Sequence, residues 1–450
     1  MNASISVIIF GATGDLYETR LSHALQALFA QGLLSQDVRI VGFGRRPLGD
    51  EGFRAFTAAA LAKKGDASSD FLARCSYVQG DLGSQDDFIK LGRYLAEGDK
   101  KAGSCSNKIF YLAVPPPFYA GIFANIAAAG LTVPCAPGES HDDTSWTRVL
   151  VEKPFGKDGA EAERLDRMLG ELFDESQIFR IDHYLAKETM QNILAFRFAN
   201  PMFMPLWNKD HIERMKIIVH EEKTVGARGG FYDGVGALRD VGQNHMLQML
   251  ALVAMEQPLD MSASAVRSAR AGILGGVRLD PGIAPFRAQY AGYRDEPGVA
   301  KDSATETFFR ATVGVDDDRW RGVPFELESG KALGASRVAI EVHFKGGNML
   351  AFAIQPREGI RLKFWFKRPG FDAALEEREL SFGYADDAGG AISHDAYERV
   401  LYDCIRGDQA LFISTEEIVE EWRITAAIIR GWQAVSLRLY PMGVAPESVQ

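Results

Sequence analysis

Short apolar runs alternate with amphipathic stretches through the first 180 residues. The runs that we interpret as buried strands cover residues 4–10, 38–42, 108–114 and 148–151. Two stretches predict helices, at 16–31 and 119–130. Strands that are separated by helices form βαβ units and a parallel sheet. We therefore expect an α/β, Rossmann-like domain at 1–180, with a surface excursion rich in Pro, Gly and Ser at 134–147.

The second half of the chain has a different pattern. Alternating apolar and polar runs follow one another closely, at 305–315, 338–344, 349–354 and 360–366. Runs so close together can pair antiparallel, with the helices gathered elsewhere. The expected helices cover 237–252, 396–406 and 415–437. We therefore predict a larger α+β domain at 181–450 with a mainly antiparallel sheet, and a boundary near 179–184.

Composition narrows the class of protein. The chain has 450 residues, 46% apolar and 24% charged, which is ordinary for a globular protein of two or three domains. Its net charge of −10 gives no general attraction to nucleic acid or to an anionic membrane. No apolar run reaches the length of a membrane span, and no signal peptide is indicated. The four cysteines form no CxxC pair, so we expect free thiols, no metal site and a cytoplasmic protein.

A glycine turn follows the first predicted strand. The run from Gly11 to Leu16 places two glycines between a strand and a helix. Such a turn lets the backbone approach a pyrophosphate, which the N–H groups at the helix start can bind. The spacing departs from GxGxxG, and an ordinary glycine turn is the alternative interpretation. The candidate cofactor-binding residues here are Gly11, Thr13, Gly14, Asp15 and Leu16.

Two arginines follow the second predicted strand. An NAD-selective site usually has an acidic residue here for the ribose 2′-hydroxyl, whereas this chain has Arg45 and Arg46. Guanidinium groups suit a 2′-phosphate, which favours NADP over NAD, although NAD remains possible. The alternative is a solvated basic turn.

The run from Arg180 to Glu188 is dense in chemically useful side chains. His183, Tyr184 and Lys187 can all donate hydrogen bonds to a phosphate, whereas an ionised Asp182 only accepts and so suits the orientation of a histidine. The alternative is a strand end followed by a charged helix start.

With this run the chain resembles the glucose-6-phosphate dehydrogenase family. The family signature Arg-Ile-Asp-His-Tyr-Leu-Gly-Lys-Glu matches residues 180–188 except at Ala186. Other matching motifs, in chain order, are Gly14-Asp15-Leu16, Glu-Lys-Pro-Phe-Gly at 152–156, Gln243-Asn244-His245, Gly-Val-Pro-Phe at 322–325 and Ser329-Gly330-Lys331. The resemblance extends from about Val7 to about Arg399 and implies a homodimer or homotetramer.

The resemblance also implies a role for each matched residue. His245 would be the general base for the anomeric hydroxyl of a hexose 6-phosphate, and Asp182 would orient it. For His245 alone, a satisfied core histidine is the alternative interpretation. The implied substrate-binding residues are Lys153, His183, Tyr184, Lys187, Glu221, Asp240 and Lys331, with Lys153 also near the cofactor. Glu221, Asp240 and Lys331 are also residue types that are common on surfaces.

The chain departs from the family pattern near the expected sugar site. Glu328 stands where the family often has a basic residue, Ser336 occupies a usually basic position, and Arg337 follows it. Earlier, Arg20 falls where the family has a lysine. A pocket-facing Glu328 would favour an amino sugar such as glucosamine 6-phosphate. In the alternative, Glu328 faces solvent and Arg337 replaces the missing contact. A third possibility is an inactive paralogue with a regulatory or assembly role.

Overall fold

The computed structural model describes residues 4–134, 145–384 and 394–450, so most of the expected excursion at 134–147 lies outside the described residues. Contacts divide the chain into two units. The first unit comprises Met1–His183 and His394–Thr415, and the second comprises Tyr184–Ser393 and Glu416–Gln450. This division differs from the single boundary that the sequence predicted, because one segment of the second half belongs to the first unit.

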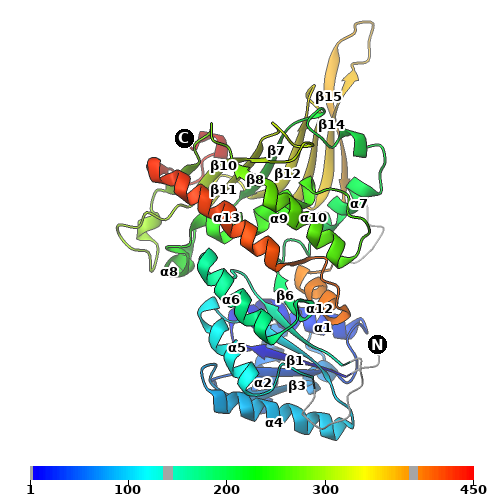
Figure 1. Cartoon of the computed structure of the whole chain (residues 1–450), viewed down its shortest axis with the longest axis vertical. Helices are drawn as coiled ribbons and strands as arrows, with labels where there is room; N and C mark the ends of the chain where they lie inside the picture. Colours follow the sequence, from blue (N-terminus) through cyan, green and yellow to red (C-terminus); the bar gives the residue numbers. More distant parts are fainter. Residues whose placement is uncertain (1–3, 135–144, 385–393) are drawn as a thin grey trace. The chain divides into compact units, whose positions relative to one another are not determined.

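The first unit contains a seven-stranded sheet in the order β16-β6-β5-β4-β1-β2-β3 (Figure 1). All neighbouring strands are parallel except β16, which pairs antiparallel with β6. The predicted parallel sheet is therefore confirmed. The strands are β1 Ile5–Phe10, β2 Arg39–Gly44, β3 Cys75–Gln79, β4 Asn107–Leu112, β5 Thr147–Val151, β6 Ile178–Ile181 and β16 Phe412–Ile413.

Local sequence explains where the helices of the first unit begin, which face they bury and where they end. In α4 the buried Phe88, Leu91 and Leu95 recur on one helical face, Ser84 caps the start and Gly103 takes the left-handed conformation at the end. The predicted helix at 16–31 begins as a π-helical turn at Tyr17–Leu21 before α1. The helices are α1 Ser22–Ala30, α2 Gly49–Leu61, α3 Ser69–Ala73, α4 Gln85–Ala102, α5 Tyr119–Ala128, α6 Gly159–Leu172 and α12 Ala396–Arg406.

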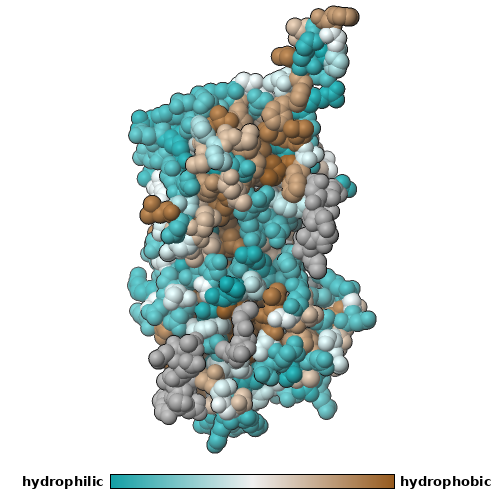
Figure 2. All heavy atoms as spheres, turned by 90° about the vertical axis from the view of Figure 1, so that its right-hand side faces the viewer, coloured by the Kyte–Doolittle hydropathy of each residue, from teal (hydrophilic) through white to brown (hydrophobic). Residues whose placement is uncertain are grey.

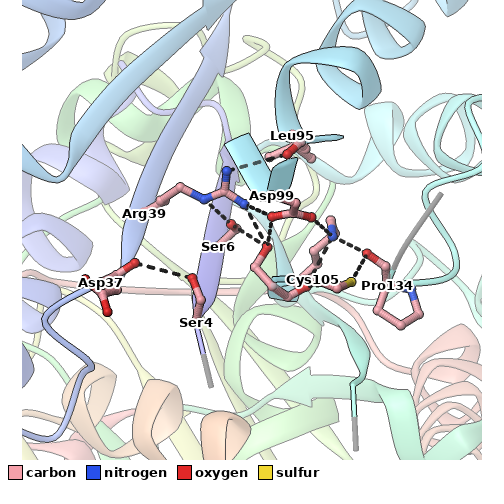
Figure 3. Close-up of polar contacts among 10 residues, drawn as sticks. Ser4, Ser6, Asp37, Arg39, Leu95, Asp99, Cys105 and Pro134 are labelled. Atoms are coloured by element: carbon pink, nitrogen blue, oxygen red, sulfur yellow. Dashed lines mark hydrogen bonds and ion pairs between the residues drawn. The ribbon is translucent and has the colours of Figure 1, made fainter. Parts of the chain in front are cut away.

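A buried ion network closes the amino-terminal end of this sheet (Figure 3). Asp99 accepts hydrogen bonds from Lys108 Nζ at 2.9 Å and Ser106 Oγ at 2.7 Å, and it also pairs with Arg39. Because Arg39 begins β2 and Lys108 lies at the start of β4, the network ties α4 to two strands. These charged and polar groups pair with one another, which offsets the free-energy cost of burying them. Nearby, Cys105 is bonded in a disulfide, whereas Cys75 and Cys404 are free and buried. The expectation of free thiols is therefore confirmed for Cys75 and Cys404 and wrong for Cys105, because sequence spacing does not reveal which cysteines the fold brings together.

The second unit contains a ten-stranded sheet in the order β15-β14-β13-β12-β7-β11-β10-β9-β17, with β8 also paired to β10. Only β7–β11 and β9–β17 are parallel pairs, so the predicted mainly antiparallel sheet is confirmed. The strands are β7 Ile212–His220, β8 Val277–Leu279, β9 Phe286–Tyr290, β10 Phe308–Val315, β11 Phe325–Gly330, β12 Arg337–Phe344, β13 Met349–Gln355, β14 Gly359–Lys367, β15 Leu375–Gly383 and β17 Arg438–Tyr440.

Helices cover one face of this sheet (Figure 1). The predicted helix at 237–252 is present, but its first part, Leu238–Met246, is π-helical before α9 begins. The last long helix stops at Gly431, earlier than predicted, and a 3₁₀ turn follows. The α-helices are α7 Glu188–Phe198, α8 Gly229–Tyr232, α9 Leu247–Ala254, α10 Ala263–Gly276 and α13 Thr415–Gly431. Over the described part of the chain, no helix has the length and apolar character that crossing a membrane requires.

Candidate active site

The predicted site residues of the first unit follow the carboxyl ends of its parallel strands. Gly11 follows β1, Arg45 follows β2, Lys153 lies two residues beyond β5, and Asp182 follows β6. Because these strands are parallel, their carboxyl ends lie on the same edge of the sheet. This is the edge at which doubly wound sheets bind ligands.

The glycine turn is built for close backbone approach. Gly11 has φ +84°, and a Cβ there would lie 2.4 Å from the carbonyl oxygen of Ala113, so only glycine fits. The Gly11 N–H donates to the Phe43 carbonyl at 3.1 Å, which ties the turn to β2. The Gly14 N–H donates to the Gly11 carbonyl at 2.9 Å, and the helical turn begins directly afterwards. This geometry fits a pyrophosphate at the start of a helix. Thr13 and Leu16 are half-buried in the turn, and Asp15 is exposed.

Arg45 and Arg46 are exposed on the turn that leaves β2. The amide of Gln79, at the end of β3, donates to the Arg45 carbonyl at 3.2 Å and so holds the backbone of this turn. The guanidinium groups can therefore meet an anion beside the glycine turn without first leaving a buried position. Arg20, on the π-helical turn, is exposed as well and lies 3.5 Å from Asp395.

Asp182 and His183 differ in burial although they are adjacent. Asp182 is 1% exposed and His183 is half-buried. The ring of His183 lies parallel to that of Tyr397 from α12, with centroids 6.1 Å apart and 12° between the planes. The segment that returns to the first unit therefore contacts a predicted phosphate ligand.

In the second unit, the parallel pair β7–β11 brings three predicted residues together. Glu221 follows β7 and Lys331 follows β11, so both leave the sheet at the same end. Lys331 Nζ pairs with the Glu221 carboxylate and lies 3.6 Å from Asp240 Oδ2. The same ammonium lies 5.3 Å from the ring centroid of the buried Tyr232.

The charges in this cluster favour hydroxyl groups over a phosphate. One ammonium and two carboxylates sum to −1, which would repel a phosphate dianion. They offer both hydrogen-bond donors and acceptors, as a sugar ring requires. Burial is the main reason that the pKa of Tyr232 lies well above its ordinary value, with Asp240 the next cause, so its hydroxyl stays protonated.

His245 lies on the π-helix and is 1% exposed. Its ring stacks on Tyr184, with centroids 4.1 Å apart and planes at 24°. Lys187 Nζ lies 4.6 Å from the centroid of the same Tyr184 ring. The predicted base and two predicted phosphate ligands are therefore brought into one contact group. Tyr184 OH also donates towards Gln355 Oε1 at 3.5 Å, a neighbour that the sequence analysis missed.

A buried polar network anchors the helix that carries His245. The Gln243 amide donates to Glu421 at 3.3 Å, and the Gln248 amide donates to Glu421 at 2.7 Å and to Glu417 at 3.1 Å. Arg270 Nε donates to Glu417 at 2.7 Å. The sequence analysis missed this network; its signal is a pair of acidic residues four apart on the buried face of α13.

Glu306, also missed, holds the start of the π-helix. Its Oε1 accepts from the Leu238 N–H at 3.0 Å, and a Cβ on Gly236 would lie 2.2 Å from that atom. Burial is the dominant cause that raises the pKa of Glu306 from its ordinary 4.5 to about 7, although the Leu238 N–H opposes it.

Glu306→Gln should become more stable relative to the unmutated chain as the pH rises. Below pH ~4.5 Glu306 is protonated in both states; between ~4.5 and ~7 it ionises only when unfolded, which favours unfolding by up to about 3 kcal/mol. The glutamine keeps an acceptor and does not titrate. Denaturant unfolding at pH 5 and pH 8 measures the difference, with the exposed Glu213→Gln as control. A pH-independent difference would contradict the prediction.

The three departures from the family pattern have local partners. Glu328 Oε1 lies 2.9 Å from His220 Nε2, and its Oε2 accepts from Arg310 Nε at 2.5 Å. Burial raises the pKa of Glu328, but His220 and Arg310 outweigh it, so the pKa is lowered and the carboxylate stays charged. It therefore neither faces open solvent nor stands as an unbalanced charge. Arg337 pairs with Glu341, and Ser336 Oγ accepts from the Glu222 N–H at 3.0 Å.

The first unit has a glycine turn at the carboxyl edge of a parallel sheet. The second unit carries a histidine, acidic residues and lysines at its predicted site positions. Together these features define a dinucleotide-dependent oxidoreductase. Residues 8–192 match the NAD binding domain of glucose-6-phosphate dehydrogenase, and residues 194–449 match its C-terminal domain. The chain belongs to the glucose-6-phosphate dehydrogenase family.

Individual relatives are similar to this chain over nearly its whole length. A cytoplasmic glucose-6-phosphate 1-dehydrogenase of Arabidopsis thaliana is 38% identical, over 94% of this chain and 85% of its own length. A chloroplastic one of Spinacia oleracea is 35% identical, over 98% of this chain and 81% of its own. A solved glucose-6-phosphate dehydrogenase in complex with its substrate glucose-6-phosphate superposes with a TM-score of 0.90 at 30% identity, covering 98% of this chain and 95% of that one.

Proposed function

We propose that this chain oxidises glucose 6-phosphate at C1 to the lactone with NADP. The observation that carries the proposal is the contact group in which the Tyr184 ring meets both His245 and Lys187. It places a potential base beside a cation that can bind a phosphate. The family membership and the solved relative that holds glucose 6-phosphate support the same substrate.

Each residue has a distinct task in this proposal. His245 takes the proton of the anomeric hydroxyl, and Asp182 orients the imidazole and stabilises its charged form. His183, Tyr184 and Lys187 donate to the substrate phosphate, while Glu221, Asp240 and Lys331 hold the ring hydroxyls and Lys153 contacts sugar and cofactor. Bound NADP would supply the acceptor for the hydride from C1. Arg45 and Arg46 bind its 2′-phosphate, with the Gly11–Leu16 turn at its pyrophosphate.

A panel of sugars tests the proposal. Glucose 6-phosphate should give the highest kcat/KM for reduction of NADP, well above glucosamine 6-phosphate and unphosphorylated glucose, measured by NADPH absorbance. The amino sugar is disfavoured because Arg310 already balances the charge of Glu328. A clear preference for glucosamine 6-phosphate would overturn the substrate assignment, and silence across the panel with folded protein would favour the inactive paralogue.

Self-association and a cytoplasmic location belong to the same proposal. Exposed apolar side chains gather on β14, β15 and the turn that joins them (Figure 2). These are Trp365, Phe366, Phe371, Leu375, Leu380 and Phe382. Clustered exposed apolar residues mark interaction surfaces, which supports a homodimer or homotetramer formed through this sheet. The relatives named for the cytoplasm support that location.

A further inference from the structure

A buried carboxylate lies directly beside Lys153 at the end of β5. Glu152 is 9% exposed, and its Oε1 accepts a hydrogen bond from Tyr111 OH at 2.6 Å. Its backbone carbonyl accepts from Tyr119 OH at 2.9 Å. Burial is the largest cause that raises the pKa of Tyr397, and the charge of Glu152 is the next, so the two side chains act on one another. Three elements of the first unit, β4, α5 and α12, therefore converge on this one residue.

Tyr397 extends the contact to a second predicted site residue. The charge of Glu152 acts on its hydroxyl, while its ring lies parallel to that of His183. Glu152 precedes Lys153 in the chain, and His183 ends the first of the two segments that form the first unit. The Glu152–Tyr397 pair thus touches both points at which the first unit presents a cation or donor to the sugar phosphate.

We propose that Glu152 and Tyr397 are positioning residues that fix Lys153 and His183 for the phosphorylated sugar. The inference rests on the proposed function. It also gives the segment 394–415 a role in the first unit, because α12 carries the Tyr397 ring that lies against His183. Neither residue needs to touch the substrate, because a strand end held by hydrogen bonds restricts the side chain that follows it.

Glu152 is a buried, hydrogen-bonded carboxyl group that is only partly ionised at neutral pH. Burial, the largest effect, raises the pKa of Glu152 from 4.5 to about 7, while the Tyr111 hydrogen bond and the charge of Lys153 lower it and Asp182 raises it. For Tyr397, after burial and the charge of Glu152, Arg20 lowers the pKa and Asp395 raises it. Ionised Glu152 accepts more strongly from its tyrosines than the neutral acid does, so the support is firmest above neutral pH.

Three variants of the full chain test the inference: Tyr397→Phe, Glu152→Gln and their combination, with Tyr402→Phe on the same helix as control. The readout is the ratio of kcat/KM for glucose 6-phosphate to that for glucose. A merely structural defect lowers both rates equally, whereas displacement of His183 and Lys153 lowers the ratio. Thermal unfolding of each variant accompanies the kinetics.

We expect the ratio to fall by on the order of 10-fold in each single variant, about the loss of one hydrogen bond to a charged group. The double variant should fall little further, since Glu152 and Tyr397 act on one another, and Tyr402→Phe should leave the ratio unchanged. If the unmutated chain oxidises glucose 6-phosphate and the variants keep its ratio, this inference alone is overturned. If the unmutated chain oxidises no hexose phosphate, the proposed function fails and the inference with it.

Discussion

His245→Ala is expected to lower kcat by about 10²- to 10⁴-fold, the usual contribution of a positioned general base, while KM for glucose 6-phosphate changes much less. Histidine is the side chain that most often serves as a general base near neutral pH. Steady-state kinetics with NADP measures the loss. Added imidazole should restore part of the rate, because the small base can enter the space that the side chain leaves.

A second variant separates the chemistry from the packing. His245 stacks on Tyr184, so its removal also frees that ring. Tyr184→Phe keeps an aromatic ring and removes only the hydroxyl, and we expect it to raise KM for glucose 6-phosphate with a smaller effect on kcat. His211→Ala, an exposed histidine just before β7, should leave both constants unchanged. Equal losses in His245→Ala and His211→Ala would refute the assignment of the base.

Local sequence pattern predicted the two sheets because each has one periodicity. Buried parallel strands are nearly continuous apolar runs, such as Ile5–Phe10, whereas β14 alternates apolar and polar residues from Ile360 to Phe364. The pattern did not predict which segments meet. β16 is two residues long and pairs with β6 from more than 200 positions away, and no local signal announces such a pairing.

In the candidate site too, the residues could be predicted from the sequence, whereas the contacts that hold them could not. The residues for the site came from motifs, and in the structure Glu221, Asp240 and Lys331 lie close together. What holds them was not predicted. Glu306 and the Glu417–Glu421 pair look like ordinary acidic residues in sequence, and only burial on the faces of folded elements distinguishes them from solvated ones. For Glu328, the sequence suggested either a side chain that faces the pocket or one that faces solvent. Its partners instead lie on the two strands that neighbour β11, namely β10 and β7.

Removing both arginines of the β2 turn, in Arg45→Ala/Arg46→Ala, is expected to raise KM for NADP on the order of 10²-fold. Hydrogen bonds to a charged group contribute about 1.5–3 kcal/mol each, and the loss of two such bonds at the lower end of this range, about 3 kcal/mol, corresponds to that factor. KM for NAD, which lacks the 2′-phosphate, should change by less than about threefold. The preference for NADP would therefore shift towards NAD, as measured by kcat/KM with each cofactor at saturating sugar phosphate.

The matched control removes two positive charges from the same unit at a distance from the turn. Arg93 and Lys101 are both exposed on α4, so Arg93→Ala/Lys101→Ala gives the same change in net charge. A long-range attraction between the protein and an anionic cofactor would weaken equally in both double variants and would fade with added salt. A direct contact with the 2′-phosphate is lost only at the turn. An NADP-specific loss in the α4 variant, or an equal rise for NAD in the turn variant, would contradict the assignment of Arg45 and Arg46.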